Sequence, residues 1–121
     1  MLSVKIESKP KISLVELQQM SLYDLVQDDR RFTIFVNDII FFTETIAICE
    51  LAQYCQKWTK KTHTDFVYNT IESDENPLLA FRKRKDGWGI ESVWRKFECF
   101  DVFSYEEVKG FVNKIISQVA E

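Results

Sequence analysis

The feature that most constrains the fold is a pair of apolar runs that flank Asn37 and Asp38 in the segment RFTIFVNDIIFFT. Phe, Ile and Val favour extended backbone, whereas Asn and Asp tolerate the positive φ angles of a tight hairpin turn. The pattern therefore predicts two antiparallel strands joined by a two-residue turn. In that register Val36 lies opposite Ile39.

Both faces of this hairpin are apolar. The two-residue turn places Ile34 opposite Phe41 on one face, and it places Phe35 and Ile40 on the other. A strand pair that is apolar on both sides needs a central position in a sheet or a second cover. One hypothesis is therefore a homodimer that buries the second face through Phe35, Ile40 and Phe42.

Similar patterns predict the rest of the fold. The chain has 121 residues, which is the size of one domain, so we expect a single unit over 1–121. Short links between neighbouring strands favour hairpins, and the predicted class is α+β, with a mainly antiparallel sheet of about five strands and two long helices packed on one face. The predicted order is a strand within 2–7, a short helix at 22–28, the two hairpin strands, a helix at 45–60, a strand at 65–71, a hairpin within 78–100 and a helix at 105–119.

Different signals predict the two long helices. Before the last helix, Ser104 and Glu107 have the spacing of a capping box, and an apolar face follows. In the helix at 45–60, a stripe at helical spacing includes Cys55 and Trp58, so this helix is expected to pack on the sheet. Glu50 lies away from the stripe and is expected to be solvated.

Charge and cysteine content limit the function classes. The net charge is -3, from 16 Lys plus Arg against 19 Asp plus Glu, which gives no overall attraction to a phosphate backbone. Three cysteines without a C-x-x-C spacing indicate neither a disulfide framework nor a zinc site. The first residues lack the apolar core of a signal peptide, and no run reaches the roughly 18 apolar residues that span a bilayer. We therefore expect a cytoplasmic protein.

The segment FRKRKDGWGIESVWRKF predicts a second hairpin with a highly charged tip. An Asp-Gly turn at 86–87 places Phe81 opposite Ser92 in the core, and it pairs Arg82 with Glu91 on the other face. This register explains much of the charge as a solvated hairpin with a cross-strand ion pair.

The alternative interpretation of the basic hairpin is a nucleic-acid-binding module. Residues 82–96 contain six cations and two anions, so this segment carries +4 and the remainder of the chain -7. An aromatic ring near the tip would stack on an exposed base while cations hold the phosphates. The residues predicted for this role are Arg82, Arg84, Lys85 and Trp88.

Patterns for catalysis and metal binding are weak. Cys55, His63 and Asp65 have the residue types of a nucleophile, a base and an orienting carboxylate. Cys55 shares the apolar face of its helix, however, which favours a packing role. One histidine and scattered cysteines do not supply a zinc site, and no Gly-rich phosphate loop precedes a helix. We therefore expect no metal, no cofactor and no enzymatic activity, and we predict a role in binding.

The order of elements resembles that of certain small bacterial proteins, which in turn resemble the immunity proteins of polymorphic toxin systems. The resemblance covers roughly residues 32–120 and is carried by FVNDIIFFTETIAICELAQYCQKW, then FVYNTIESDENPLLAFRKRKDGWGIESVW, then a capped helix. It implies a single-domain cytosolic protein that neutralises a cognate toxin by covering its active site. It provides no binding residue that can be transferred.

Acidic residues are the candidate contacts for such a partner. Toxins that attack nucleic acids are commonly basic, so carboxylates on an inhibitor increase the rate and complementarity of association. The predicted partner-binding residues are Glu72, Asp74 and Glu75, and a second candidate group is Asp101, Glu106 and Glu107. The structural alternative is that these residues are solvated residues of a turn and of a helix start.

Overall fold

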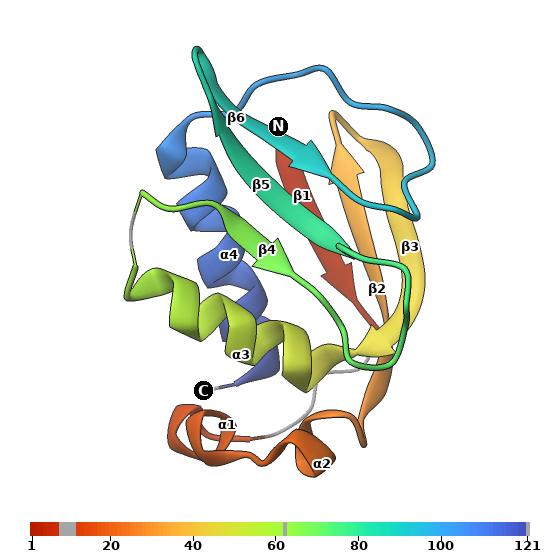
Figure 1. The fold of residues 1–121 in the computed structure, drawn as a ribbon, viewed down its shortest axis with the longest axis vertical. Helices are drawn as coiled ribbons and strands as arrows, with labels where there is room; N and C mark the ends of the chain where they lie inside the picture. The colour runs from red at the N-terminus through yellow and green to blue at the C-terminus, as the bar shows by residue number, and fades with distance from the viewer. Residues whose placement is uncertain (8–11, 62, 121) are drawn as a thin grey trace.

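The computed structural model describes residues 1–7, 12–61 and 63–120, and Figure 1 shows their arrangement. The fold is α+β with antiparallel sheets, as predicted. The strands of the described residues form two three-stranded sheets, however. The prediction of a single sheet of about five strands is therefore wrong.

The first sheet contains β1 (Leu2–Ile6), β2 (Asp29–Val36) and β3 (Ile39–Ala47), in the order β1-β2-β3. Asn37 and Asp38 form the turn between β2 and β3, with φ angles of 51° and 67°. Val36 pairs with Ile39. The predicted hairpin and its turn are confirmed.

A bulge at Phe41 changes the predicted pairing further along this hairpin. Ile34 pairs with Phe42 instead of Phe41, whereas Phe35 pairs with Ile40. The unpaired extra residue lets Phe41 and Phe42 both enter the core, where both are buried. The surface predicted for a homodimer at Phe35, Ile40 and Phe42 is therefore not intact, because Phe42 does not reach the exterior.

The second sheet contains β4 (Phe66–Tyr68), β5 (Leu79–Arg84) and β6 (Gly87–Glu91), in the order β4-β5-β6. The turn between β5 and β6 lies at Lys85 and Asp86, one residue earlier than predicted. Phe81 consequently pairs with Ile90 and not with Ser92. Because the pairing moves by two positions, each side chain stays on its predicted face.

Gly87 explains why the turn is displaced. Its φ angle is 148°, and a Cβ at this position would lie 2.8 Å from the carbonyl oxygen of Phe103. Trp88 and Phe103 exchange two backbone hydrogen bonds, of 2.9 and 2.8 Å. Gly87 therefore permits the close crossing of the chain that precedes the last helix, and its positive φ lies directly after the turn.

Residues 92–104 explain why the strands form two sheets. This segment bonds to β6 through Phe103, and the N–H of Lys96 donates to the carbonyl oxygen of Phe41 on β3 at 2.7 Å. It thus occupies the two strand edges that would pair with each other in a single sheet. Figure 1 shows the segment passing over β3 and along the top of the molecule toward α4.

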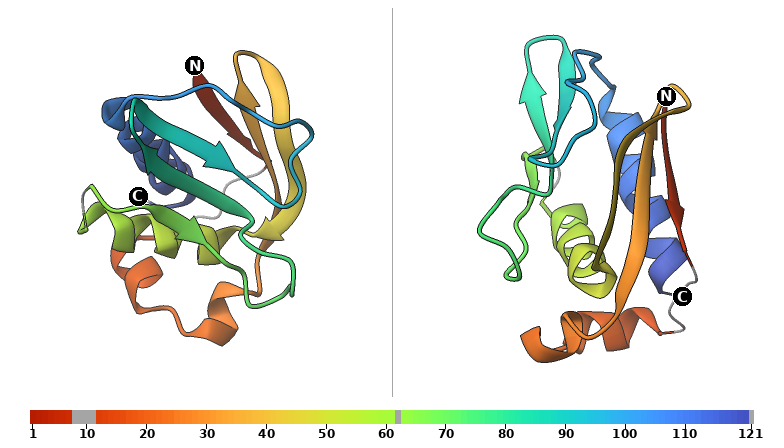
Figure 2. Two further views of the ribbon diagram at one scale, coloured as in Figure 1. Left: turned by 45° about the horizontal axis from the view of Figure 1, so that its top comes forward. Right: turned by 90° about the vertical axis from the view of Figure 1, so that its right-hand side faces the viewer.

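The two long helices are α3 (Ile48–Thr59) and α4 (Tyr105–Val119). They pack against each other, and each contacts both sheets: α3 touches β2 and β4, and α4 touches β1 and β6. The prediction that they cover one face of one sheet is therefore wrong, as Figure 2 shows from the side. The limits of α4 agree with the prediction, whereas α3 starts three residues later because β3 continues to Ala47.

The short helix predicted at 22–28 is present but shorter, as α2 (Leu22–Leu25), and the stretch before it contains a second short helix, α1 (Leu14–Gln19). Ser13 and Glu16 form a complete capping box that starts α1. Part of the preceding stretch, residues 8–11, lies outside the described residues. Among the helices described, none combines the length and apolarity needed to cross a bilayer.

Candidate functional site

The predicted partner-binding carboxylates are exposed in the loop between β4 and β5, and they are Glu72, Asp74 and Glu75. We call residues 70–78 the acidic loop. Asn76 closes it: its Oδ1 accepts from the N–H of Thr70 at 2.9 Å, and its Nδ2 donates to the carbonyl oxygens of Thr70 and Ser73 at 3.3 and 2.9 Å. The loop is closed by an uncharged side chain, and the carboxylates of Glu72 and Asp74 form no ion pair within the described residues, whereas that of Glu75 accepts from the indole of Trp94 at 3.2 Å.

A buried carboxylate supports the start of the acidic loop. Glu50 on α3 is 1% exposed, so the prediction that it is solvated is wrong. Its Oε1 accepts from the hydroxyl of Tyr68 at 2.7 Å, and its Oε2 accepts from the N–H of Ile71 at 3.3 Å. Burial, and then the hydrogen bond to Glu50, raise the pKa of Tyr68 above its ordinary value. The phenol thus remains a donor, and Glu50 ties the helix to the loop.

Negative charge is concentrated on one side of the acidic loop. Desolvation raises the pKa of Glu72, and the carboxylates of Asp29 and Glu50 raise it further. Asp29 and Glu72 line the same cavity, which has a volume of about 220 Å³. Mutual repulsion among these carboxylates favours the approach of a basic group from a partner.

The basic hairpin holds most of its functional groups in internal contacts. The Nε of Arg82 lies 2.7 Å from a carboxylate oxygen of Glu91, so the predicted ion pair is present. Trp88 is 3% exposed and faces the core, so its ring is not available to stack on a base in this conformation. Arg84 and Lys85 are exposed, and neither has an ion pair in the part of the chain that the structure describes.

Gly89 leaves room for the side chain of Arg84. A Cβ on Gly89 would overlap the guanidinium of Arg84, so the missing side chain lets Arg84 lie across β6. Each glycine of the GWG motif therefore permits a close approach, of Phe103 at Gly87 and of Arg84 at Gly89.

The residues considered for a catalytic triad have separate roles. Cys55 is fully buried, and burial raises the pKa of its thiol, which disfavours the reactive thiolate. His63 is exposed and stacks on Tyr105 with ring centroids 4.3 Å apart. Asp65 accepts from the backbone N–H of Lys83 at 2.8 Å. In the described ranges, no three His, Cys, Asp or Glu side chains are grouped to hold a metal ion.

The acidic loop is joined to the segment that follows β6. The N–H of Val93 donates to the carbonyl oxygen of Pro77 at 3.0 Å, and the indole of Trp94 donates to Glu75 at 3.2 Å. We call the acidic loop together with residues 92–102 the two-loop surface. Its two parts are far apart in sequence but form one continuous region.

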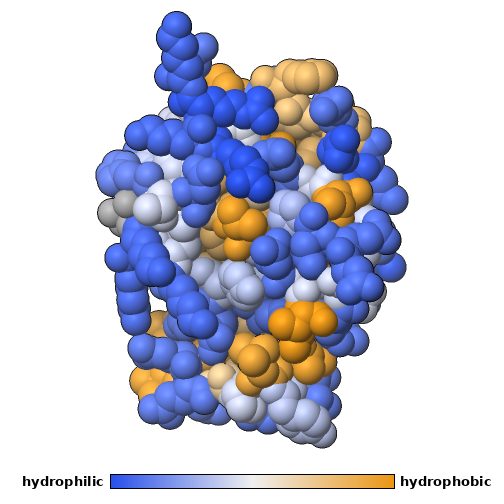
Figure 3. Space-filling view, in the orientation of Figure 1, coloured by the Kyte–Doolittle hydropathy of each residue, from blue (hydrophilic) through white to orange (hydrophobic). Residues whose placement is uncertain are grey.

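Large apolar side chains are exposed on the two-loop surface. Phe100 is 78% exposed, which is unusual for an aromatic side chain that lacks a polar group. The full set is Ile71, Val93, Phe100 and Val102. Figure 3 shows hydrophobic side chains in separate patches among charged ones on this face, including at its upper edge.

Sequence reasoning missed Phe100. In the run FECFDVF, three phenylalanines stand at every third position, yet Phe103 is buried, Phe97 is half-buried and Phe100 is exposed. This segment is neither helix nor strand, so it has no period from which the exposed member is recognisable.

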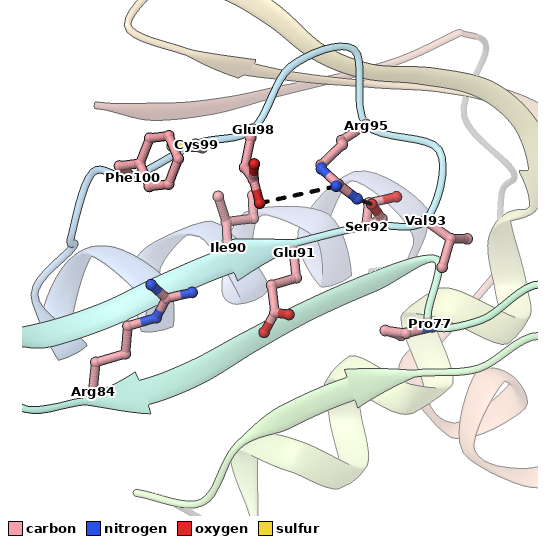
Figure 4. Close-up of a pocket in the computed structure, with 10 residues that line it drawn as sticks. All are labelled: Pro77, Arg84, Ile90, Glu91, Ser92, Val93, Arg95, Glu98, Cys99 and Phe100. Carbon is pink, nitrogen blue, oxygen red and sulfur yellow. Dashed lines mark hydrogen bonds and ion pairs between the residues drawn. The ribbon is translucent and has the colours of Figure 1, made fainter.

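A cavity of about 200 Å³ lies between β6 and the arch of residues 93–100. Figure 4 shows Arg84 crossing β6 on one side and Arg95 and Glu98 descending from the arch on the other. Arg95 donates to the carbonyl oxygen of Ser92 at 3.0 Å, and it lies 4.0 Å from Glu98. Phe100 lines the same cavity, so the cavity opens within the two-loop surface.

The family model described as "Domain of unknown function (DUF7878)" matches residues 2–121. The chain belongs to this family. Both sheets and the two-loop surface lie within the DUF7878 match. No curated protein and no solved structure matches the chain. The DUF7878 match does not test the resemblance to immunity proteins, which stays a prediction.

Proposed function

We propose that this protein is a noncatalytic protein-binding domain that binds its partner through the two-loop surface. The observation that carries the proposal is the 78% exposure of Phe100, on the segment whose Trp94 donates to Glu75 of the acidic loop. Exposed aromatic side chains are enriched in the centres of protein interfaces, and surrounding polar groups provide orientation and specificity.

The partner that fits this surface is a basic protein. Glu72 and Asp74 have no ion pair in the parts of the chain that are described, and Asn76 already orders the loop that carries them. A preordered acidic surface gains association rate from a basic partner and loses little conformational entropy on binding. Neutralisation of a basic toxin, as in the immunity proteins that the chain resembles, is the form of this role that we propose.

The basic hairpin supports nucleic-acid binding less well than this role. Trp88, the aromatic side chain predicted to stack on a base, lies in the core, and Arg82 already has carboxylate partners. The exposed cations Arg84 and Lys85 retain their attraction for phosphate.

Affinity purification from the native host with matched variants tests the proposal. Phe100→Ala is expected to lose the partner, whereas Tyr23→Ala is expected to keep it, because Tyr23 is similarly exposed but lies on α2. The combined change Glu72→Gln, Asp74→Asn and Glu75→Gln is expected to slow association and to reduce its salt dependence. A partner retained by Phe100→Ala, or lost equally by both aromatic variants, contradicts the proposal.

A further inference from the structure

The outer edge of β6 has one residue whose main-chain groups lack a partner. In an antiparallel ladder, alternate residues direct their N–H and C=O groups to opposite sides. The N–H and C=O groups of Trp88 point away from β5 and bond to Phe103. The N–H and C=O groups of Ile90, two residues later, therefore also point away from β5. No hydrogen bond from the described residues reaches the N–H or the C=O of Ile90. Ile90 is 2% exposed and lines the cavity between β6 and the arch.

The positions on either side of Ile90 are occupied. Trp88 is bonded to Phe103, and the carbonyl oxygen of Ser92 accepts from Arg95. The open part of the edge is therefore one residue long. A strand that ran through the cavity would displace both contacts, whereas the end of a chain enters without doing so.

Arg84 gives the cavity an unpaired positive charge. Two carboxylates line the cavity, but Glu91 is held by Arg82 at 2.7 Å and Glu98 lies beside Arg95. Arg84 lies across β6 over Gly89 and has no carboxylate within ion-pair distance in the described ranges. A guanidinium in this setting favours a carboxylate.

We propose that this cavity binds the carboxyl-terminal end of a partner polypeptide. The terminal carboxylate pairs with Arg84, and the residue before it donates its N–H to the C=O of Ile90 and accepts from the N–H of Ile90 through its own C=O. Pro77, Val93 and Phe100 on the wall favour a small apolar last side chain, and a volume of about 200 Å³ suits one or two residues. The inference rests on the proposed protein-binding function and names the part of the partner that is recognised.

Titration of the ¹⁵N-labelled full chain by NMR tests this site. The probe is N-acetyl-Ala-Val with a free carboxyl group, used up to roughly 20 mM because a ligand of this size binds weakly. The amide signal of Ile90 is expected to shift and saturate. The same peptide with a C-terminal amide is expected to bind at least about tenfold more weakly, because it lacks the charge that pairs with Arg84. Acetate supplies the carboxylate alone and is expected to leave Ile90 unshifted.

Variants of matched charge identify the group that holds the carboxylate. Arg84→Gln is expected to weaken binding of the free acid by about tenfold or more, whereas Lys85→Gln, an exposed cation that does not line the cavity, is expected to keep it. Gly89→Ala retains every charge but displaces Arg84, and it should weaken binding as well. The spectrum of each variant shows directly whether the fold is kept.

An Ile90 signal that does not move, or equal affinities for the acid and the amide, would overturn the assignment. Equal effects of Arg84→Gln and Lys85→Gln would do the same. These results are separable from those on the proposed function. If binding of the partner depends on Phe100 but the peptide does not bind, only the assignment of the cavity is overturned. If the peptide binds at Ile90 but binding of the partner does not depend on Phe100, the proposed binding surface is overturned instead.

Discussion

The acidic loop and the basic hairpin are the two most charged regions described above, and they are built in opposite ways. Asn76, an uncharged side chain, closes the acidic loop, the buried Glu50 supports its start, and the carboxylates of Glu72 and Asp74 remain exposed and free of ion pairs in the described residues. In the basic hairpin, charged and aromatic groups themselves hold the structure: Arg82 pairs with Glu91, and Trp88 fills the core.

The density of charge along a sequence therefore does not show which charges are available to a partner. A charged group that is already paired inside the protein must lose that pair before it contacts a partner. A charged group that is not needed to hold the fold together can contact a partner directly. On this basis the acidic loop is the stronger candidate for binding a partner. Among the cations of β5, Arg84 is the one to which we assign a ligand.

The largest expected effect concerns the basic hairpin. Trp88→Ala should lower the free energy of unfolding by about 4 kcal/mol, because it empties a core position. Lys85→Ala at the exposed turn should leave stability almost unchanged. Urea denaturation measures both. A small loss for Trp88→Ala would mean that the ring faces solvent, and the contrast between the two regions would disappear.

Removing the support of the acidic loop should have the next largest effect. Glu50→Ala leaves the Tyr68 hydroxyl and the Ile71 N–H without their acceptor, and it should cost about 3 kcal/mol. Glu50→Gln keeps an acceptor and should cost less. Denaturation curves that show the same loss for both variants would indicate that the hydrogen bonds are not what Glu50 contributes.

Asn76 tests the uncharged scaffold directly. Asn76→Ala removes three hydrogen bonds within the loop and should destabilise the protein by about 2 kcal/mol. Asn69→Ala is the control, because no side-chain hydrogen bond of Asn69 is found in the described residues. Denaturation together with hydrogen exchange of residues 70–78 measures the effect. Unchanged exchange in this loop would show that Asn76 does not order it.

The pKa of Tyr68 predicts a loss of stability at alkaline pH. Because burial raises this pKa in the folded state, the unfolded chain releases the proton first, near its ordinary value of about 10. Stability is therefore complete below that pH and falls above it, by about 1.4 kcal/mol per pH unit from this group. Tyr68→Phe should make the decline shallower. A decline equally steep in wild type and variant would exclude Tyr68 as its source.

The smallest effect is expected for the ion pair of the basic hairpin. Arg82→Gln breaks the contact with Glu91, but both side chains are more than two-fifths exposed. The loss of stability should therefore be no more than about 0.5 kcal/mol and should vanish at high salt. Denaturation at two ionic strengths measures it. A loss above 1 kcal/mol that persists in salt would show a pair that is better shielded than its exposure indicates.

Local patterns predicted much of the fold. The Asn37-Asp38 turn, the limits of α4 and its cap by Ser104 all follow from residues that are neighbours in the sequence. The Ser104 hydroxyl accepts from the N–H of Glu107, as the capping-box spacing indicates. The side chain of Glu107 does not complete the box, however, because it accepts from the N–H of Leu2 on a distant strand.

The features that the sequence did not reveal depend on distant partners. Glu50 is buried because Tyr68 and the acidic loop supply its donors, and its own helix gives no sign of them. The turn after β5 is displaced because Phe103 crosses Gly87. Within the candidate site, the position of the carboxylates in an exposed loop was predicted correctly. Phe100 and the cavity were not, because they arise from an irregular segment that covers two strand edges.

The central claim is that residues 92–104 cover the edge of β6 except at Ile90, which leaves a binding position open. Residue-resolved hydrogen exchange of the free protein tests it most directly. The account predicts slow exchange at Trp88, which bonds to Phe103, and at Gly89 and Glu91, which bond to β5, but fast exchange at Ile90 between them. An Ile90 amide as protected as that of Trp88 would contradict the claim.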